Sequence, residues 1–360
     1  MKKILTAMLS LIISASFAQK DSSKSPLSIS GYVEAYYSYD ILDHDDHEQA
    51  PFIYNFERNN EVTLNLGFIN ANYTTKNVRG NFGLMAGTWA QYNQIVEQPL
   101  LRNLWQANIG VKLSKKKNLW LDAGVLPSHI GFESPVGESC DALTRCIIGD
   151  NTPSYESGVK LGYTSDKGKW FLSALYLNGW QRIARVDENS TLCFGTQITF
   201  TPNKKVTLNY STFIGNDKPD SVAQMRYYHN LYALLNLTDK FRTTLGFDYC
   251  MEQKSKGNSK YNTLYSPVII LHYQCCNKLA MSVRGEYYND ENGILIATGT
   301  PNGFQTIGYS LNLDYAIRDN VLWRIEGRGL KSKDKIFSLN KDDVPNNQKY
   351  FITTSLAIAF

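Results

Sequence analysis

Large apolar residues alternate with smaller or polar ones along much of the chain, most clearly in its last eleven residues. One face carries Tyr350, Ile352, Thr354, Leu356, Ile358 and Phe360, and the other carries Phe351, Thr353, Ser355, Ala357 and Ala359. A period of two predicts an extended strand with two unlike faces. About 11 residues is also the length that a tilted strand needs to cross a bilayer.

The same pattern recurs and predicts an all-β fold: a transmembrane, antiparallel, up-and-down β-barrel of about 16 strands. The predicted strands are residues 28–39, 61–73, 78–91, 104–113, 118–126, 154–164, 169–178, 191–201, 205–214, 225–237, 240–251, 261–274, 278–288, 304–316, 320–330 and 349–360. The barrel then covers residues 28–360.

The connections between these strands alternate in length. Short ones, rich in Lys, Asn, Asp and Gly, are residues 74–77, 114–117, 165–168, 202–204, 238–239, 275–277 and 317–319. Long ones are residues 40–60, 92–103, 127–153, 179–190, 215–224, 252–260, 289–303 and 331–348. Short periplasmic turns and long extracellular loops are typical of bacterial outer-membrane barrels, and this arrangement puts both termini on the periplasmic side.

Charged side chains fall on one face of several strands, opposite large apolar ones. A charge on the lipid face costs about 2–4 kcal/mol at the bilayer midplane, so the charged face is expected to line the lumen. Sixteen strands leave room for an aqueous channel. The predicted pore-lining residues are Arg242, Asp248, Arg284, Glu286, Asp314, Arg324, Glu326 and Arg328, with Asn312 beside them. Residues 169–178 and 261–274 give no clean face assignment.

The N-terminus predicts export. Residues 1–18 have Lys2 and Lys3, an apolar core and a small-residue cleavage site ending at Ala18, as a signal peptide does. Residues 19–27 form a short polar periplasmic tail. Removing Lys2 and Lys3 lowers the formal charge from +4 to +2, which argues against a nucleic-acid partner.

The longest loop, residues 127–153, is the best candidate for a constriction of the channel. A loop of this length is usually functional or disordered. Its charged residues are Glu133, Glu138, Asp141, Arg145 and Asp150. The alternative is an external surface loop.

The same region carries a family resemblance. The residues are Gly124-Val125-Leu126-Pro127-Ser128-His129-Ile130-Gly131-Phe132-Glu133-Ser134, then Leu143-Thr144-Arg145, then Asp150-Asn151-Thr152-Pro153-Ser154-Tyr155-Glu156-Ser157-Gly158-Val159-Lys160-Leu161. They resemble the OmpL-like β-barrel porin family of Bacteroidota outer membranes. The resemblance implies a barrel with porin-like transport and brings no residue-level site. In general porins of 16 strands, the third long loop folds into the barrel, and trimers are common.

Cysteines and histidines offer further candidates. An exported chain permits disulfides, and Cys140 and Cys146 could close a small ring in the loop. A bridge between Cys275 and Cys276 would be strained. A metal could bind Asp43-His44-Asp45-Asp46-His47-Glu48, although a solvated acidic loop is the preferred interpretation, so no metal or cofactor is predicted.

A hydrolase is also considered and not favoured. His129 lies beside Ser128 and near Glu133, but adjacency in sequence does not make a catalytic triad. We therefore expect no enzyme but an outer-membrane porin that passes small hydrophilic solutes or ions by diffusion. The alternative is a structural or adhesive barrel without channel activity. The expected partners are outer-membrane lipid, the transported solutes and the barrel-assembly machinery, because the terminal Phe360 resembles the sorting signal of outer-membrane barrels. A homotrimer is left open as the oligomeric state.

Overall fold

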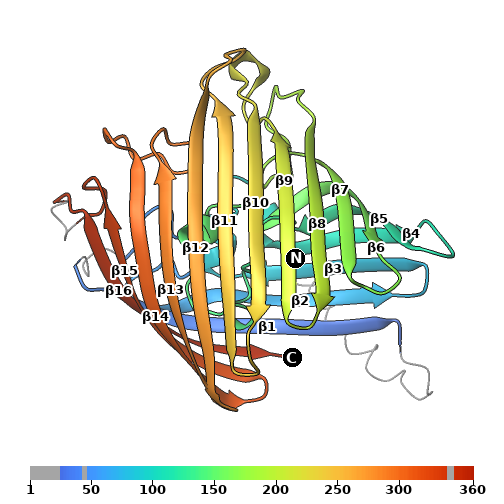
Figure 1. Cartoon of the computed structure of the whole chain (residues 1–360), viewed down its shortest axis with the longest axis horizontal. Helices are drawn as coiled ribbons and strands as arrows, with labels where there is room; N and C mark the ends of the chain where they lie inside the picture. Colours follow the sequence, from blue (N-terminus) through green and yellow to red (C-terminus); the bar gives the residue numbers. More distant parts are fainter. Residues whose placement is uncertain (1–24, 43–46, 339–343) are drawn as a thin grey trace, which may run out of the picture.

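The computed structural model describes residues 25–42, 47–338 and 344–360. Sixteen antiparallel strands form a closed barrel in which each strand pairs with its neighbours in sequence and β1 pairs with β16, which confirms the predicted fold class (Figure 1). The strands are β1 (Leu27–Asp40), β2 (Val62–Thr74), β3 (Val78–Ala86), β4 (Leu104–Lys112), β5 (Asn118–Pro127), β6 (Tyr155–Thr164), β7 (Trp170–Leu177), β8 (Cys193–Asn203), β9 (Val206–Gly215), β10 (Arg226–Asn236), β11 (Phe241–Gln253), β12 (Tyr261–Cys276), β13 (Leu279–Asp290), β14 (Phe304–Arg318), β15 (Val321–Ser332) and β16 (Gln348–Ala359).

The barrel closes where the two ends of the sheet meet. The backbone N–H of Gly31 donates to the carbonyl of Phe360 (2.7 Å), and the N–H of Phe360 donates back to Gly31 (3.0 Å). A Cβ on Gly31 would lie 2.5 Å from the ring of Phe360, so this ring packs directly on the backbone of β1. Closure leaves no unpaired sheet edge, which a membrane-spanning sheet cannot tolerate.

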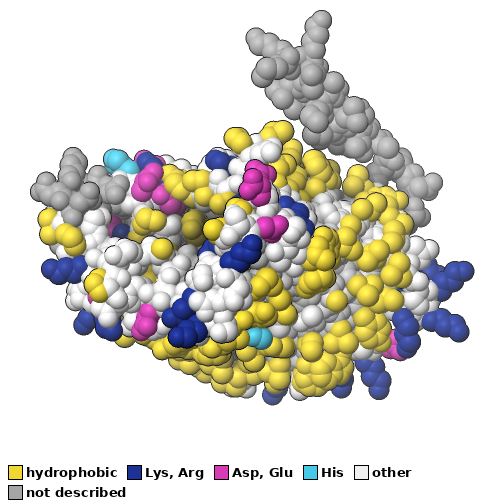
Figure 2. Space-filling view, turned by 90° about the horizontal axis from the view of Figure 1, so that it is seen from above, with side chains coloured by type: hydrophobic (Ala, Val, Ile, Leu, Met, Phe, Trp, Pro, Cys, Tyr) yellow, Lys and Arg dark blue, Asp and Glu magenta, His cyan; other side chains and the backbone are white. Residues whose placement is uncertain are grey.

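The period-two pattern assigns the two faces correctly in the strands where it was clear. On β13, Met281 and Val283 are 39% and 51% exposed on the outer wall, whereas Arg284 is 1% exposed and faces the lumen. On β16, Ile352 and Leu356 face outward, and Thr353 is buried. Figure 2 shows hydrophobic side chains over a broad area of the outside, with Lys and Arg side chains toward its edges.

The connections form two unlike rims. We call the ends joined by the short connections the short-turn rim, and the opposite ends the long-loop rim. The long connections contain helices α2 (Thr88–Asn93) and α3 (Ile147–Asp150) and the 3-10 turns η1 (Leu101–Asn103), η2 (Gly137–Ser139) and η3 (Asp220–Val222). Among the described residues, no helix is long and apolar enough to cross a membrane.

Helix α2 corrects one predicted element. Residues 78–91 were expected to form a single strand, but β3 ends at Ala86 and α2 begins at Thr88. Gly87 turns the chain inward with φ 126°, where a Cβ would lie 2.3 Å from the carbonyl oxygen of Asn65. The positive φ favours glycine and ends the strand at this point. Trp89 then packs inside the barrel, 1% exposed.

Candidate functional site

The loop of residues 127–153, which we call the inner loop, lies inside the barrel. Its first anchor is His129. The Nδ1 of His129 lies 2.8 Å from both carboxylate oxygens of Glu156 on β6, and its Nε2 lies 2.8 Å from the carbonyl oxygen of Thr212 on β9. Because both partners only accept, both ring nitrogens must donate, and the ring is an imidazolium. Burial opposes this charge, but the Glu156 carboxylate and the two hydrogen bonds outweigh it and raise the pKa of His129.

The wall is shaped to receive this ring. A Cβ on Gly195 of β8 would lie 2.5 Å from the Nε2 of His129. The hydroxyl of Ser211 donates to the carbonyl of His129 (2.7 Å), and the side chain of Asn230 accepts from the N–H of Gly131 (3.1 Å). The loop thereby leaves β5 and crosses to β9 and β10. The imidazolium and these bonds make His129 a structural anchor, an arrangement unlike the base of a Ser-His hydrolase.

The second anchor is on the opposite wall, at Thr144. Its N–H donates to one carboxylate oxygen of Glu326 on β15 (2.6 Å), and its hydroxyl donates to the other (2.9 Å). Arg284 of β13 donates to the carbonyl of Thr144 (2.5 Å) and also to Glu326 (2.8 Å). Arg328 donates to the carbonyl of Arg145 (2.8 Å) and to Glu286 (2.7 Å). Each buried charge on this wall therefore has both an ionic partner and a loop partner.

Arg324 of β15 holds a third segment of the loop. Its guanidinium donates to the carbonyls of Gly137 (2.7 Å) and Cys140 (3.0 Å) and pairs with Asp314 on β14 (2.6 Å). It is 0% exposed. On the same wall, Asn312 accepts from the N–H of Leu143 (3.2 Å), and Glu286 accepts from the N–H of Ile147 (2.6 Å).

The predicted pore-lining residues thus divide into two groups. All of them face the lumen, but those of β13, β14 and β15 are covered by the inner loop and do not border open water. Two others do border cavities: Arg242, which pairs with Asp141 of the loop, and Asp248. Folded chain occupies much of the lumen, so the space for an aqueous channel is reduced to the cavities beside the inner loop.

The charged residues of the inner loop also differ in their surroundings. Arg145 is buried and donates to three carbonyls of the loop itself, those of Ser134 (2.5 Å), Leu143 (2.5 Å) and Pro135 (3.2 Å). Glu133 accepts from the N–H of Cys146 (2.8 Å). Arg145 and Glu133 therefore hold the loop in its own shape.

Asp150 and Glu138, the other two acidic residues of the predicted constriction, have different surroundings. Asp150 accepts from the side chain of Asn55 (2.7 Å), which ties α3 to the first long loop. Burial raises the pKa of Asp150 to about 7. Glu138 is exposed at η2. Cys140 and Cys146 are both free, buried thiols, so the suggested disulfide is not present in the structure, and Cys275 and Cys276 are likewise unbonded.

Apolar packing closes the lumen on the side of β1 to β4. Trp89 and Ala90 of α2 pack with Tyr32, Leu66 and Met85. A larger cluster joins the inner loop to the opposite wall, through Ile130, Ile147 and Ile148, with Leu175 and Leu177 of β7 and Leu264, Val268 and Ile270 of β12. The sequence reasoning missed both clusters. The apolar lumen faces of β7 and β12 were the available signal, since they are why residues 169–178 and 261–274 showed no clean alternation.

A series of cavities remains, much of it beside the inner loop where it faces β9 to β12. An inner cavity of about 320 Å³ lies toward the short-turn rim and is lined by Thr207, Asn236 and Arg242 among others. An outer cavity of about 280 Å³ lies toward the long-loop rim, beside Trp180 and Arg226. Between them lies a cavity of about 20 Å³, which we call the neck. The neck shares Phe132 and Glu133 with the inner cavity and Thr152 with the outer cavity.

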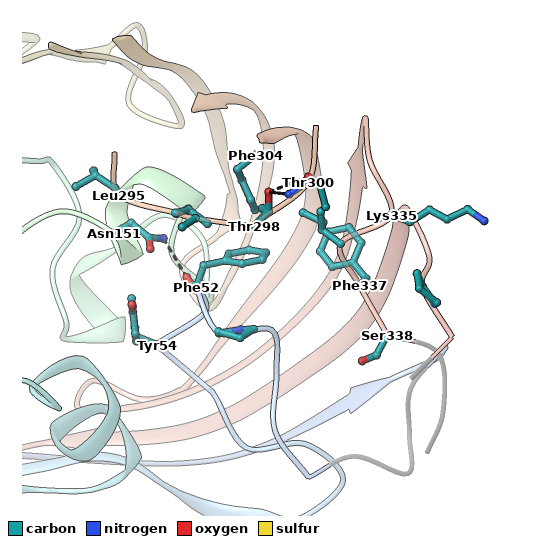
Figure 3. A pocket seen from close by; sticks show the side chains of 15 residues that line it. Phe52, Tyr54, Asn151, Leu295, Thr298, Thr300, Phe304, Lys335, Phe337 and Ser338 are labelled. Carbon is teal, nitrogen blue, oxygen red and sulfur yellow. Dashed lines mark hydrogen bonds between the residues drawn. The ribbon is translucent and has the colours of Figure 1, made fainter. Parts of the chain in front are cut away.

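A fourth cavity of about 520 Å³, the vestibule, adjoins the outer cavity and shares Tyr54, Asn151 and Leu295 with it. Figure 3 shows the rings of Phe52 and Phe337 in this cavity. Asn151 fixes its floor by donating to the carbonyl of Phe52 (3.0 Å; Figure 3). Neighbouring cavities share lining residues, from the vestibule toward the long-loop rim to the inner cavity toward the short-turn rim.

No site for a metal is found within residues 25–42, 47–338 and 344–360, where no three His, Cys, Asp or Glu side chains converge. The acidic segment that was considered for a metal falls partly outside the described residues, because Asp43, His44, Asp45 and Asp46 are not among them.

Comparison with known protein families identifies the family of this chain. The family described as "Putative beta-barrel porin-2, OmpL-like" matches residues 26–360. The chain belongs to this family. This OmpL-like porin has the barrel expected of an outer-membrane protein, and the resemblance seen in its sequence is confirmed. No curated protein matches it.

Several solved structures similar to this OmpL-like porin are described as porins or outer-membrane proteins. OmpT of Vibrio cholerae, in a trimer form, has a TM-score of 0.60 at 10% identity and covers 93% of this chain and 99% of its own. An anion-selective porin from Comamonas acidovorans has a TM-score of 0.60 at 9% identity, with 93% and 99% covered. Salmonella typhi OmpF, in a complex with daunomycin, has a TM-score of 0.55 at 10% identity, with 93% and 97% covered. At such identities the likeness shows the fold.

Proposed function

We propose that this OmpL-like porin is a passive diffusion channel for small hydrophilic solutes or ions. The observation that carries the proposal is the series of cavities along the inner loop, from the vestibule through the neck to the inner cavity. Membership of a porin family and the porin-like fold support it. The route needs no chemistry, because passage depends on the width of the channel and the charge of its wall.

We propose also that the inner loop is the constriction. It is fixed to both walls, through His129 on one side and Thr144 on the other. Phe132 borders the neck, and its ring packs on Gly246 of β11, where a Cβ would lie 2.5 Å from a ring carbon. A neck of about 20 Å³ is close to the volume that holds one water molecule. Passage is therefore limited at this ring rather than at either rim.

Single-channel conductance of the refolded protein in a planar bilayer tests this proposal. We expect discrete steps from the wild type and larger steps from Phe132→Ala, because the substitution opens the neck. Phe194→Ala is the matched control, since Phe194 faces outward on β8. If the steps of Phe132→Ala equal those of the wild type, the proposal that the inner loop constricts the channel at Phe132 is wrong. Absence of steps from correctly folded protein would overturn the channel itself.

A barrel without channel activity is the second candidate function. The observations that favour it are the small volume of the neck and the apolar cluster that joins the inner loop to the walls. A structural or adhesive role would then rest on the long loops. The same conductance measurement separates the two candidates, because a closed barrel gives no steps.

Orientation, export and assembly complete the proposal. We propose that the short-turn rim is periplasmic, that residues 1–18 are removed after Ala18, and that the assembly machinery reads the terminal Phe360, which is 64% exposed. Residues 1–18 lie outside the described residues. We propose a homotrimer because OmpT of Vibrio cholerae is described in a trimer form. The mass of the denatured chain tests the processing, and the mass of the native protein in detergent tests the oligomeric state. A monomer would overturn the trimer.

A further inference from the structure

The lining of the neck contains two carboxylates, Glu133 and Asp248, and no Lys, Arg or His. The remaining lining comes from residues of the inner loop and from Ser154, which are apolar or uncharged. Any ion that follows the series of cavities has to pass these two acidic groups at the narrowest point.

Asp248 of β11 is held rigidly and is only partly satisfied. It is 2% exposed. Its Oδ1 accepts from the hydroxyl of Tyr228 (2.8 Å) and from the side chain of Asn230 (2.8 Å), both fully buried on β10. Within the described part of the chain, Oδ2 accepts no hydrogen bond from protein. Oδ2 is not fully buried, so water or an ion in the neck can reach it.

Glu133 of the inner loop is in a similar position. Its Oε2 accepts from the N–H of Cys146 (2.8 Å), which fixes the carboxylate. Its Oε1 is buried and has no hydrogen-bond partner among the described residues. The nearby guanidinium of Arg145 does not line the neck and donates instead to carbonyls of the loop. Two carboxylates on opposite sides, one from the loop and one from the wall, thus each keep an oxygen without a protein donor.

We propose that the neck is a cation filter: the free carboxylate oxygens of Glu133 and Asp248 take over part of the hydration of a small cation and repel anions. This inference rests on the proposed channel function and names its substrate class. Rings of acidic side chains select cations in this way in other channels, and the effect is strongest in a narrow, poorly hydrated segment.

The adjoining cavities do not carry the same charge. The outer cavity is lined by three basic residues, Arg182, Lys218 and Arg226, and by the two acidic residues Asp150 and Asp217. In the inner cavity, the basic residue Arg242 is paired with Asp141. Both wider cavities therefore mix the two signs, and only the neck is purely acidic. This distribution puts the selectivity at Glu133 and Asp248.

Reversal potentials across a KCl gradient test the filter, with the wild type, Glu133→Gln, Asp248→Asn and the double variant in planar bilayers. We expect a cation-selective wild type and a double variant whose K⁺ to Cl⁻ permeability ratio is lower by roughly fivefold, because both fixed charges are gone. Glu138→Gln is the control, since it removes the same charge from an exposed position of the same loop.

The wild type alone supplies a second measurement, in case a variant does not fold. Replacing K⁺ by the bulky N-methyl-D-glucamine cation should abolish most of the current, whereas replacing Cl⁻ by gluconate should change it little. Loss of current on replacing Cl⁻ instead, or a permeability ratio that the double variant leaves unchanged, would overturn the filter and leave the channel standing. Absence of any current from folded protein would overturn both.

Discussion

The two walls that the inner loop touches use charged residues in opposite ways. On β13 to β15, Arg284, Arg324 and Arg328 are buried, and each is matched by a carboxylate and by loop carbonyls. On the side of β11, Asp248 keeps an oxygen without a protein donor and borders a cavity. Ion pairs and bonds to loop carbonyls make the first wall an anchor, although the Nε atoms of Arg284 and Arg328 have no hydrogen-bond partner. On the second wall, the carboxylate remains available to a passing ion. The two walls differ in what borders the charged groups, because the inner loop covers the arginines, whereas Asp248 borders the neck.

Removing an anchor should have the largest effect. Arg324→Ala leaves Asp314 and the carbonyls of Gly137 and Cys140 without their donor. Loss of one partner from a buried ion pair costs about 3–5 kcal/mol, so we expect a lower unfolding midpoint and irregular, larger conductance steps. Arg318→Ala is the matched control on an exposed position of β14. If Arg324→Ala and Arg318→Ala behave alike in denaturant titrations, the β13 to β15 wall does not hold the loop.

An intermediate effect is expected where β8 receives His129. In Gly195→Ala, the new Cβ would lie 2.5 Å from the Nε2 of a ring that is already bonded on both sides. Overpacking of this kind costs about 1–3 kcal/mol, and we expect the unfolding midpoint in denaturant to fall accordingly. Gly327→Ala is the control, because a Cβ there meets nothing within 4 Å. Equal unfolding midpoints of the two variants would contradict the close packing of the His129 ring against Gly195.

The smallest expected effect is the pH dependence of the same anchor. Glu156 and Thr212 raise the pKa of His129 against the opposing effect of burial. A raised pKa means that the folded state holds the proton more tightly than the unfolded state, where the pKa is about 6.5. The stabilisation is therefore complete below about pH 6.5 and is lost as the pH rises through the folded-state pKa.

This dependence is measured as the difference in unfolding free energy between the wild type and His129→Gln from pH 6 upward. The difference should shrink with rising pH. A difference for His129→Gln that is constant with pH would show that the ring is not held as an imidazolium.

The sequence predicted the barrel well because each strand crosses from one rim to the other with lipid on one side. That environment imposes the same alternation wherever water or polar groups lie on the other side, as on β13 and β16. On β7 and β12 the lumen side is apolar too, because Leu175, Leu264 and Ile270 pack in the cluster that contains the inner loop. Alternation disappears in those strands, and the sequence alone could not assign their faces.

The candidate site was predictable only as a set of residues. The sequence pointed to the inner loop and to the charges of β13 to β15, but their pairing depends on which strand faces which segment of the loop. Thr144 meets Glu326 across 182 positions of sequence, and no local pattern encodes such a contact. The neck depends in addition on how Phe132 packs against Gly246, so Glu133 and Asp248 could not be recognised as neighbours.

The central claim is that solutes pass on the β9 to β12 side of the inner loop. Single-channel conductance of Thr207→Trp and Asn72→Trp tests it directly, because both positions face the lumen and are half-buried near the short-turn rim, on different walls. Thr207 lines the inner cavity, and Asn72 does not. We predict smaller steps from Thr207→Trp and wild-type steps from Asn72→Trp. Smaller steps from Asn72→Trp, with Thr207→Trp unchanged, would contradict this route.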